Sequence, residues 1–93
     1  MSSTWSVEFE KEAIRDLERL DSLVREDVLE KIEWLKNHFE VMTPHPLGAV
    51  WHGFYKIRIG DYRAIYDITW SKQLLTIVII DHRSRVYKRK KRS

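Results

Sequence analysis

Residues 54–66 read Phe54-Tyr55-Lys56-Ile57-Arg58-Ile59-Gly60-Asp61-Tyr62-Arg63-Ala64-Ile65-Tyr66, and this stretch decides the fold. Its two halves alternate apolar and polar side chains, and Gly60-Asp61 between them is typical of a two-residue β-hairpin loop. Such a loop fixes the register of the two strands, so Arg58 is expected opposite Arg63. The alternation predicts a cationic face made of Lys56, Arg58 and Arg63, and an apolar face made of Tyr55, Ile57, Ile59, Tyr62, Ala64 and Tyr66.

The cationic face of this hairpin carries charges of one sign only. Two like charges directly opposite each other on a sheet repel and lower stability. Two interpretations follow: three solvated charges on an exposed face, or a binding site for a polyanion. Solvated faces normally mix both signs, which favours the polyanion.

The charge of the chain is divided unevenly between its halves. Residues 1–47 contain 11 acidic and 6 basic side chains, whereas residues 48–93 contain 3 acidic and 11 basic ones. Because phosphate neutralisation dominates the electrostatics of nucleic-acid binding, this asymmetry indicates nucleic-acid contact through the C-terminal half. Near the C-terminus we predict RNA contacts for Arg85, Lys88, Arg89, Lys90 and Lys91. The alternative is a run of charges that contacts only solvent.

The length and composition predict a single domain over residues 1–93, with a basic C-terminal tail at 88–93. The chain has no cysteine, which excludes a thiolate nucleophile and a thiolate zinc site and fits a reducing compartment. Its longest apolar run, Ile77-Val78-Ile79-Ile80, is far too short for a membrane span, and its start has no signal-peptide pattern. We therefore expect a cytoplasmic protein with no membrane partner.

The N-terminal half predicts one strand and two helices. Residues 5–9 alternate as a short strand does, and residues 10–20 carry apolar side chains at helical spacing. A second helix, capped by Asp21 or Ser22, is expected to reach His38 or Phe39. Its apolar stripe comprises Val24, Val28, Ile32, Leu35 and Phe39. Prolines at 44 and 46 then end the helical region.

The C-terminal half predicts a β-meander. After a loop to Val50 and the hairpin, whose second strand reaches Thr69, residues 70–73 form a turn. Residues 74–80 then form a strand that is apolar on both faces. The chain thus predicts a two-layer α+β fold, in which the N-terminal strand and helical hairpin pack on an antiparallel meander. A two-residue turn at 71–72 would pair Tyr62 with Asp81 and point Arg83 toward the apolar face. A site that includes Arg83 therefore requires the last strand to end or bulge near Asp81-His82.

Familiar catalytic motifs are absent from the sequence, including glycine-rich phosphate loops, HExxH and Gly-x-Ser-x-Gly. The four histidines (residues 38, 45, 52 and 82) include no pair at helical ligand spacing, and we interpret them as ordinary surface or loop residues. The second half has only three carboxylates, which disfavours two-metal phosphodiester chemistry. We predict no cofactor and no metal, and assign the chemistry to cations and tyrosines.

The hairpin pattern Tyr-x-Ile-Arg-x-Gly-x-Tyr-Arg, followed by His82-Arg83 and Val86-Tyr87, resembles the RelE/ParE superfamily of toxins. The likeness covers nearly the whole chain. It implies a RelE-like fold and a type II toxin that a cognate antitoxin holds inactive. In the RelE branch it further implies an mRNA interferase, an endoribonuclease that enters the ribosomal A site, cleaves mRNA without a metal and inhibits translation.

Carried over position by position, the resemblance places the catalytic set at Lys56, Arg58, Arg63, Arg83 and Tyr87. One position departs from the pattern, because the place of Arg58 is a lysine in the best-known member. Arginine stays protonated in proteins, so Arg58 is not expected to shuttle a proton.

The residue types fit RNA cleavage on their own terms. RNA supplies its own nucleophile, the 2′-hydroxyl, so its cleavage needs alignment, charge stabilisation and proton transfer but no metal. Arg63 is a candidate phosphate clamp, and Arg83 a candidate stabiliser of the leaving oxygen. Tyr87 is a candidate general base, or a platform that stacks on a nucleobase. The alternative for Tyr87 is a terminal aromatic side chain that seals the core.

Three other functions remain open from the sequence. A ParE-like inhibitor of DNA gyrase without nuclease activity is the first, although that branch commonly lacks the Lys/Arg/Tyr set. A relative with a histidine base is disfavoured by Val86, which occupies the place before Tyr87. A pure RNA-binding module is the third, should Tyr87 be buried. In each toxin case we expect the antitoxin to dock on the acidic helical hairpin and to cover the cationic face with acidic residues.

Overall fold

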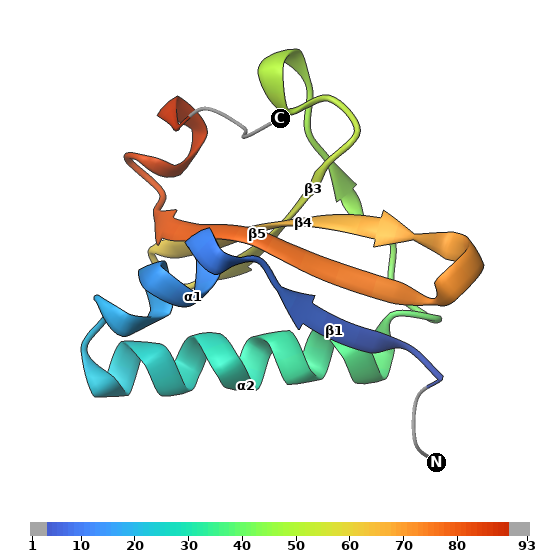
Figure 1. Cartoon of the computed structure of the whole chain (residues 1–93), viewed down its shortest axis with the longest axis horizontal. Coiled ribbons are helices and arrows are strands. Elements are labelled where there is room, and N and C mark those ends of the chain that lie inside the picture. The colour runs from blue at the N-terminus through green and yellow to red at the C-terminus, as the bar shows by residue number, and fades with distance from the viewer. Residues whose placement is uncertain (1–3, 90–93) are drawn as a thin grey trace.

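The computed structural model describes residues 4–89 and confirms a two-layer α+β fold (Figure 1). Its helices and strands, in chain order, are β1 (Ser6–Phe9), α1 (Lys11–Glu18), α2 (Ser22–His38), β2 (His45–Pro46), β3 (Tyr55–Ile59), β4 (Tyr62–Thr69) and β5 (Leu74–His82). Three short 3-10 turns join them: η1 (Ala49–Trp51), η2 (Trp70–Lys72) and η3 (Val86–Lys88). Among the described helices, none is long and apolar enough to cross a membrane.

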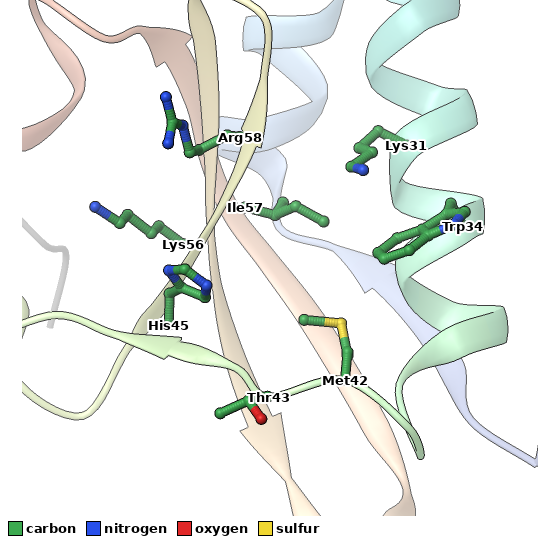
Figure 2. A pocket seen from close by; sticks show the side chains of 8 residues that line it. All are labelled: Lys31, Trp34, Met42, Thr43, His45, Lys56, Ile57 and Arg58. Atoms are coloured by element: carbon green, nitrogen blue, oxygen red, sulfur yellow. The ribbon is translucent and has the colours of Figure 1, made fainter.

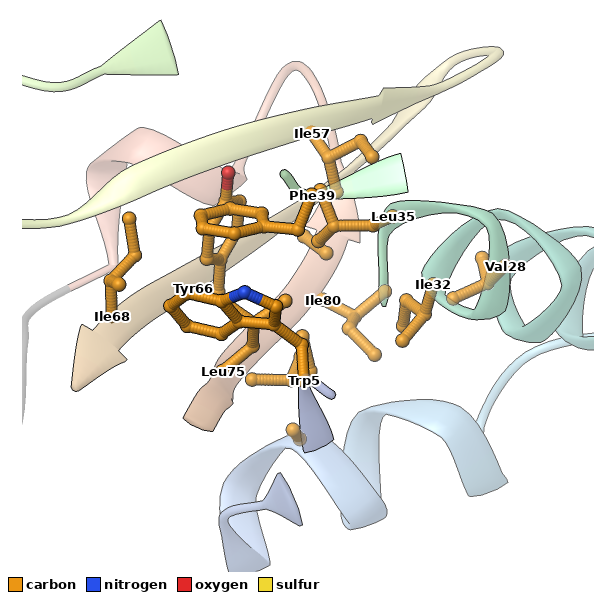
Figure 3. Close-up of a cluster of buried hydrophobic side chains, with 13 residues drawn as sticks. Trp5, Val28, Ile32, Leu35, Phe39, Ile57, Tyr66, Ile68, Leu75 and Ile80 are labelled. Atoms are coloured by element: carbon orange, nitrogen blue, oxygen red, sulfur yellow. The ribbon is translucent and has the colours of Figure 1, made fainter. Parts of the chain in front are cut away.

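Both helices lie against one face of the sheet, as Figure 1 shows. The predicted apolar stripe of α2 packs there, because helical spacing brings its side chains to a single side. Figure 3 shows this core, where α2 meets Trp5 and the inward side chains of β3, β4 and β5. The α2 residues buried in it are Val28, Ile32 and Leu35, with Phe39 just beyond the helix end.

The sheet has the strand order β1-β5-β4-β3-β2. The three-stranded antiparallel meander β3-β4-β5 is confirmed, and its hairpin register matches the prediction, with Arg58 opposite Arg63. Two edge strands complete the sheet. On one side β1 runs parallel to β5, and on the other β2 pairs with β3 through His45 opposite Lys56. We expected a loop at β2, because a two-residue strand is too short to show alternation.

A β-bulge changes the register between β4 and β5. Tyr66 pairs with Ile77 but Ile65 pairs with Ile79, so Val78 is the extra residue. The shift places Arg63 opposite Asp81 and Tyr62 opposite His82. Odd-numbered residues after the bulge therefore face away from the helices. The bulge lies three residues before Asp81, near which the sequence required one, and β5 also ends at His82. Arg83 is therefore not directed into the helix-side core.

The sheet face opposite the helices is partly covered. We expected that face to be left to solvent or ligand, but its centre carries a second hydrophobic cluster. The loop around η1 and the turn η3 fold over it, as the upper part of Figure 1 shows. The buried members of this outer cluster are Trp51, Ile65, Val78, Ile79 and Val86.

The hydroxyl of Tyr66 lies in the helix-side core without a hydrogen-bond partner among the described residues. The side chain is fully buried and stacks on Tyr55. Burial, with a smaller contribution from the charge of Tyr55, raises the pKa of the Tyr66 phenol well above its usual range. The hydroxyl is therefore neutral at all ordinary pH values, and its burial lowers stability.

We predict that Tyr66→Phe raises the free energy of unfolding by about 1–2 kcal/mol, because it removes a buried polar group without changing the packing. Tyr66→Ala is the matched control, and should lower it by about 3–5 kcal/mol through loss of the ring. Urea unfolding followed by circular dichroism measures both. A Phe variant less stable than the wild type would show that the hydroxyl has a partner.

Candidate functional site

Lys56 and Arg58 are alternate residues of β3 and project away from α2, as Figure 2 shows. Lys56 is half-buried and Arg58 is exposed. Within residues 4–89, neither side chain has a carboxylate at ion-pair distance. The predicted cationic face therefore exists in part, with two positive charges on one strand that no internal acid neutralises.

The strand register places Arg63 on the cationic face, but its side chain is buried. Only 7% of the residue is accessible, and its Nη1 donates to the backbone oxygens of Gly60 and Tyr62, each at 2.8 Å. Gly60 has a φ of 56°, which a two-residue hairpin loop requires and glycine tolerates. In this structure Arg63 closes the hairpin turn through its Nη1, and its role as a phosphate clamp stays a prediction.

Tyr87 lies on the same side of the sheet as Lys56. Its neighbour Val86 is fully buried in the outer cluster, which fixes the η3 turn against the sheet. The Lys56 ammonium is then 5.7 Å from the centre of the Tyr87 ring. Tyr87 is 37% exposed, so it neither seals the core nor is withdrawn from solvent. A pure RNA-binding module was the alternative for a buried Tyr87, so this exposure does not favour it.

Arg83 lies just beyond the end of β5, next to the hairpin turn. Its backbone N–H donates to the backbone oxygen of Asp61 at 2.8 Å, and its Nε is 3.8 Å from the Asp61 carboxylate. Both side chains are well exposed, so this ion pair contributes little and Arg83 stays available to a ligand.

The basic residues of the tail differ in their surroundings. Lys88 is exposed, and Arg85 forms an exposed ion pair with Asp81 at 3.2 Å. Arg89 is turned inward instead and contacts three carboxylates, which leaves little of its guanidinium open to RNA. Lys90 and Lys91 lie outside the described residues.

His45 is a candidate that sequence reasoning did not assign. The two-residue strand β2 places it directly opposite Lys56, and Figure 2 shows the two side chains next to each other. It is exposed. Its imidazole has two ring nitrogens, which can donate or accept a proton and so suit proton transfer. The only sequence signal was its place between two prolines, where an extended backbone is favoured.

A cavity of about 410 Å³ opens where β3 faces α2 (Figure 2). Trp34 forms one wall, held between the Lys31 ammonium at 4.0 Å and the stacked ring of His38. Met42 and Ile57 point into the same space, whereas Lys56 and Arg58 project from its far rim. The site thus borders an apolar recess on the edge of the sheet. Among residues 4–89, no group of three potential metal ligands is arranged so that it could hold a metal ion.

The sequence matches a family model over residues 7–87, described as the ParE toxin of type II toxin–antitoxin systems, parDE. The chain belongs to the RelE/ParE superfamily of type II toxins. No curated protein matches it significantly.

Solved structures of similar toxins support the same membership. The toxin is 28% identical to a chain of the RelBE2 toxin–antitoxin complex from Mycobacterium tuberculosis, with a TM-score of 0.78, covering 90% of this chain and 95% of that one. It is 25% identical to a chain of the archaeal RelE–RelB complex from Pyrococcus horikoshii OT3, with a TM-score of 0.67 and coverage of 88% and 98%. The isolated E. coli RelE toxin, at 23% identity, shares the fold, with a TM-score of 0.70 and coverage of 90% and 92%.

We predict different effects for the two arginines that face each other across the hairpin. Arg63→Met should lower the free energy of unfolding by about 2–3 kcal/mol, because two buried hydrogen bonds from a charged donor are lost. Arg58→Met should change it by less than about 0.5 kcal/mol, because the side chain is exposed. Urea unfolding of the two variants checks this. Equal losses would contradict the structural role of Arg63.

Proposed function

We propose that this toxin is a ribosome-dependent, metal-independent endoribonuclease that cleaves mRNA through its 2′-hydroxyl and so inhibits translation. One observation carries the proposal: Lys56, Arg58 and Tyr87 lie on one face, with Lys56 beside the Tyr87 ring and without an internal carboxylate partner in the described chain. A face with unneutralised cations next to an exposed aromatic ring suits a single-stranded RNA backbone and its bases.

In the proposed reaction, the 2′-oxygen attacks the adjacent phosphorus and the bond from phosphorus to the 5′-oxygen breaks. The products are a 2′,3′-cyclic phosphate and a 5′-hydroxyl. Lys56 and Arg58 stabilise the negative charge that develops on the phosphorane oxygens. Arg83, at the end of β5, stabilises the departing 5′-oxygen, which takes up a proton from solvent.

The proton of the 2′-hydroxyl needs an acceptor within reach of the same phosphate. Tyr87 is the acceptor that the family pattern suggests, and His45 is the one that the β2–β3 pairing adds. Tyr87 also supplies a ring face for a nucleobase. The pH dependence of cleavage separates the two: it changes on removal of the side chain that accepts the proton, in Tyr87→Phe or His45→Gln.

The proposed partners are mRNA in the ribosomal A site and a cognate antitoxin. Related toxins were crystallised in complex with RelB-type antitoxins, which supports the second partner. On the helical hairpin, Leu23 is 74% exposed and Ile14 and Leu29 are also open to solvent. Exposed apolar side chains on two acidic helices suit a surface that an antitoxin covers.

Inhibition of DNA gyrase is the second candidate function, because the matching family model is that of the ParE toxin. Gyrase inhibition depends on a protein–protein contact and not on a cleaved phosphodiester. A gyrase supercoiling assay with the purified toxin, run beside the RNA assay, therefore distinguishes the two.

We predict that wild-type toxin cleaves mRNA on programmed ribosomes, and that Lys56→Met and Tyr87→Phe each lower the cleavage rate by about 10²–10³-fold. Lys72→Met is the matched control, because Lys72 is an exposed lysine of η2, a turn that does not contribute to the site. Mapping of 5′ ends by primer extension measures the rates. Inhibited supercoiling without any RNA cleavage would overturn the proposal in favour of the gyrase inhibitor.

A further inference from the structure

The last described residue, Arg89, is held by three carboxylates from distant parts of the chain. Its Nη1 donates to Asp16 Oδ2 at 2.9 Å and to Asp81 Oδ2 at 3.4 Å, and its Nη2 donates to Glu12 Oε1 at 3.3 Å. Glu12 and Asp16 are on α1, and Asp81 is near the end of β5. Arg89 thus joins the C-terminal turn to the first helix.

Asp16 is the centre of this arrangement. Its side chain is only 5% exposed, and the same Oδ2 atom also accepts the backbone N–H of Ile80 at 2.9 Å. A buried carboxylate is costly unless it is both paired and hydrogen-bonded, and Arg89 and Ile80 meet the two requirements. Burial by itself lowers the pKa of the Arg89 guanidinium, but the hydrogen bond and charge of Asp16, with the charges of Asp81 and Glu12, raise that pKa above its ordinary value. The Arg89 guanidinium therefore stays positively charged over the whole working pH range.

Tyr87 lies between two fixed points. Val86, on one side of it, is buried in the outer cluster, and Arg89, two residues later, is held against α1. The turn between them is a three-residue 3-10 helix with two backbone hydrogen bonds, from Lys88 to Arg85 at 3.0 Å and from Arg89 to Val86 at 3.3 Å. So short a turn has little stability of its own.

We propose that Asp16 and Arg89 are positioning residues that hold Tyr87 beside Lys56 in the active conformation. This inference rests on the endoribonuclease function proposed above. Neither residue needs to touch RNA, because Arg89 is only 24% exposed and its guanidinium is taken up by carboxylates. Displacement of a reacting group by about 1 Å costs on the order of 10²-fold in rate. Loss of the ion pair should therefore appear in kcat and leave KM for the RNA unchanged.

The chain offers a matched control in Arg19. This residue also pairs with Asp16, at 4.0 Å, but its side chain is 74% exposed and it lies at the end of α1, not on the turn. Arg89→Met removes the contact between the turn and Asp16, whereas Arg19→Met leaves it in place. Arg89→Lys keeps the positive charge but cannot bridge three carboxylates, so it should restore only part of the effect. Asp16→Asn, which keeps an oxygen for the Ile80 N–H, is the second variant should Arg89→Met fail to fold.

The experiment combines single-turnover cleavage of mRNA on ribosomes with amide hydrogen exchange of the free toxin at Lys88 and Arg89. For Arg89→Met and Asp16→Asn we expect exchange at least about 10-fold faster and kcat lower by about 10–100-fold, with KM within about 2-fold of the wild type. Arg89→Lys should fall between, and Arg19→Met within about 3-fold of the wild type.

Two results would overturn the proposal: a folded Arg89→Met toxin with wild-type kcat, or an equal loss of kcat in Arg19→Met. Should the wild type cleave no RNA, the proposed function fails and exchange alone decides the structural part. Faster exchange in Arg89→Met would then still show that the ion pair stabilises the turn, and unchanged exchange would overturn that part of the proposal.

Discussion

The register shift at Val78 is the constraint on which the outer face of the sheet depends. Without the extra residue, Ile79 and Asp81 would point toward the helices, and the Asp81 carboxylate would enter a core that is otherwise apolar. With it, Ile79 joins Ile65 in the outer cluster and Asp81 reaches the carboxylate group around Arg89. The outer cluster buries Val86 in turn, and Val86 places Tyr87 next to Lys56. A single unpaired residue in β5 therefore connects strand pairing with the geometry of the candidate site.

The basic side chains of the C-terminal half have different structural roles, which a count of charges does not show. Arg63 closes the hairpin turn, Arg89 neutralises a buried carboxylate, and Arg85 is paired at the surface. Lys56 and Arg58 have no such internal partner in residues 4–89, and Arg83 has only an exposed one. Within residues 4–89, the positive charge without a buried or internal partner is thus smaller than the sequence suggests, and near the candidate site it lies on β3, at Arg83 beyond β5 and at Lys88. Charges gathered in this way suit one bound phosphate better than an evenly basic surface does.

The fold was predictable from sequence where periodicity was strong. The stripe of α2 and the Gly60-Asp61 hairpin each allow one arrangement, and both were found. The position of the bulge was not predictable, because Ile77-Val78-Ile79-Ile80 is apolar throughout. Such a run has no apolar–polar alternation in which a change of register could be seen. β2 was missed because two residues cannot alternate, and with it the place of His45. The burial of Arg63 and Arg89 could not be read from a charge run either, since the oxygens that bind them are set by the turn geometry and by a helix 73 residues away.

The parallel pairing of β1 with β5 has a consequence for how the protein is made. Within residues 4–89, Ser6–Phe9 has one strand partner, Leu74–His82, which follows it by more than 60 residues. Contacts between such distant segments form late in folding, because a long loop must close first. During synthesis, the first strand therefore leaves the ribosome with an open edge and stays unpaired until β5 has followed. The nascent chain cannot complete its sheet, nor the surface built on it, before residues 74–82 have been made.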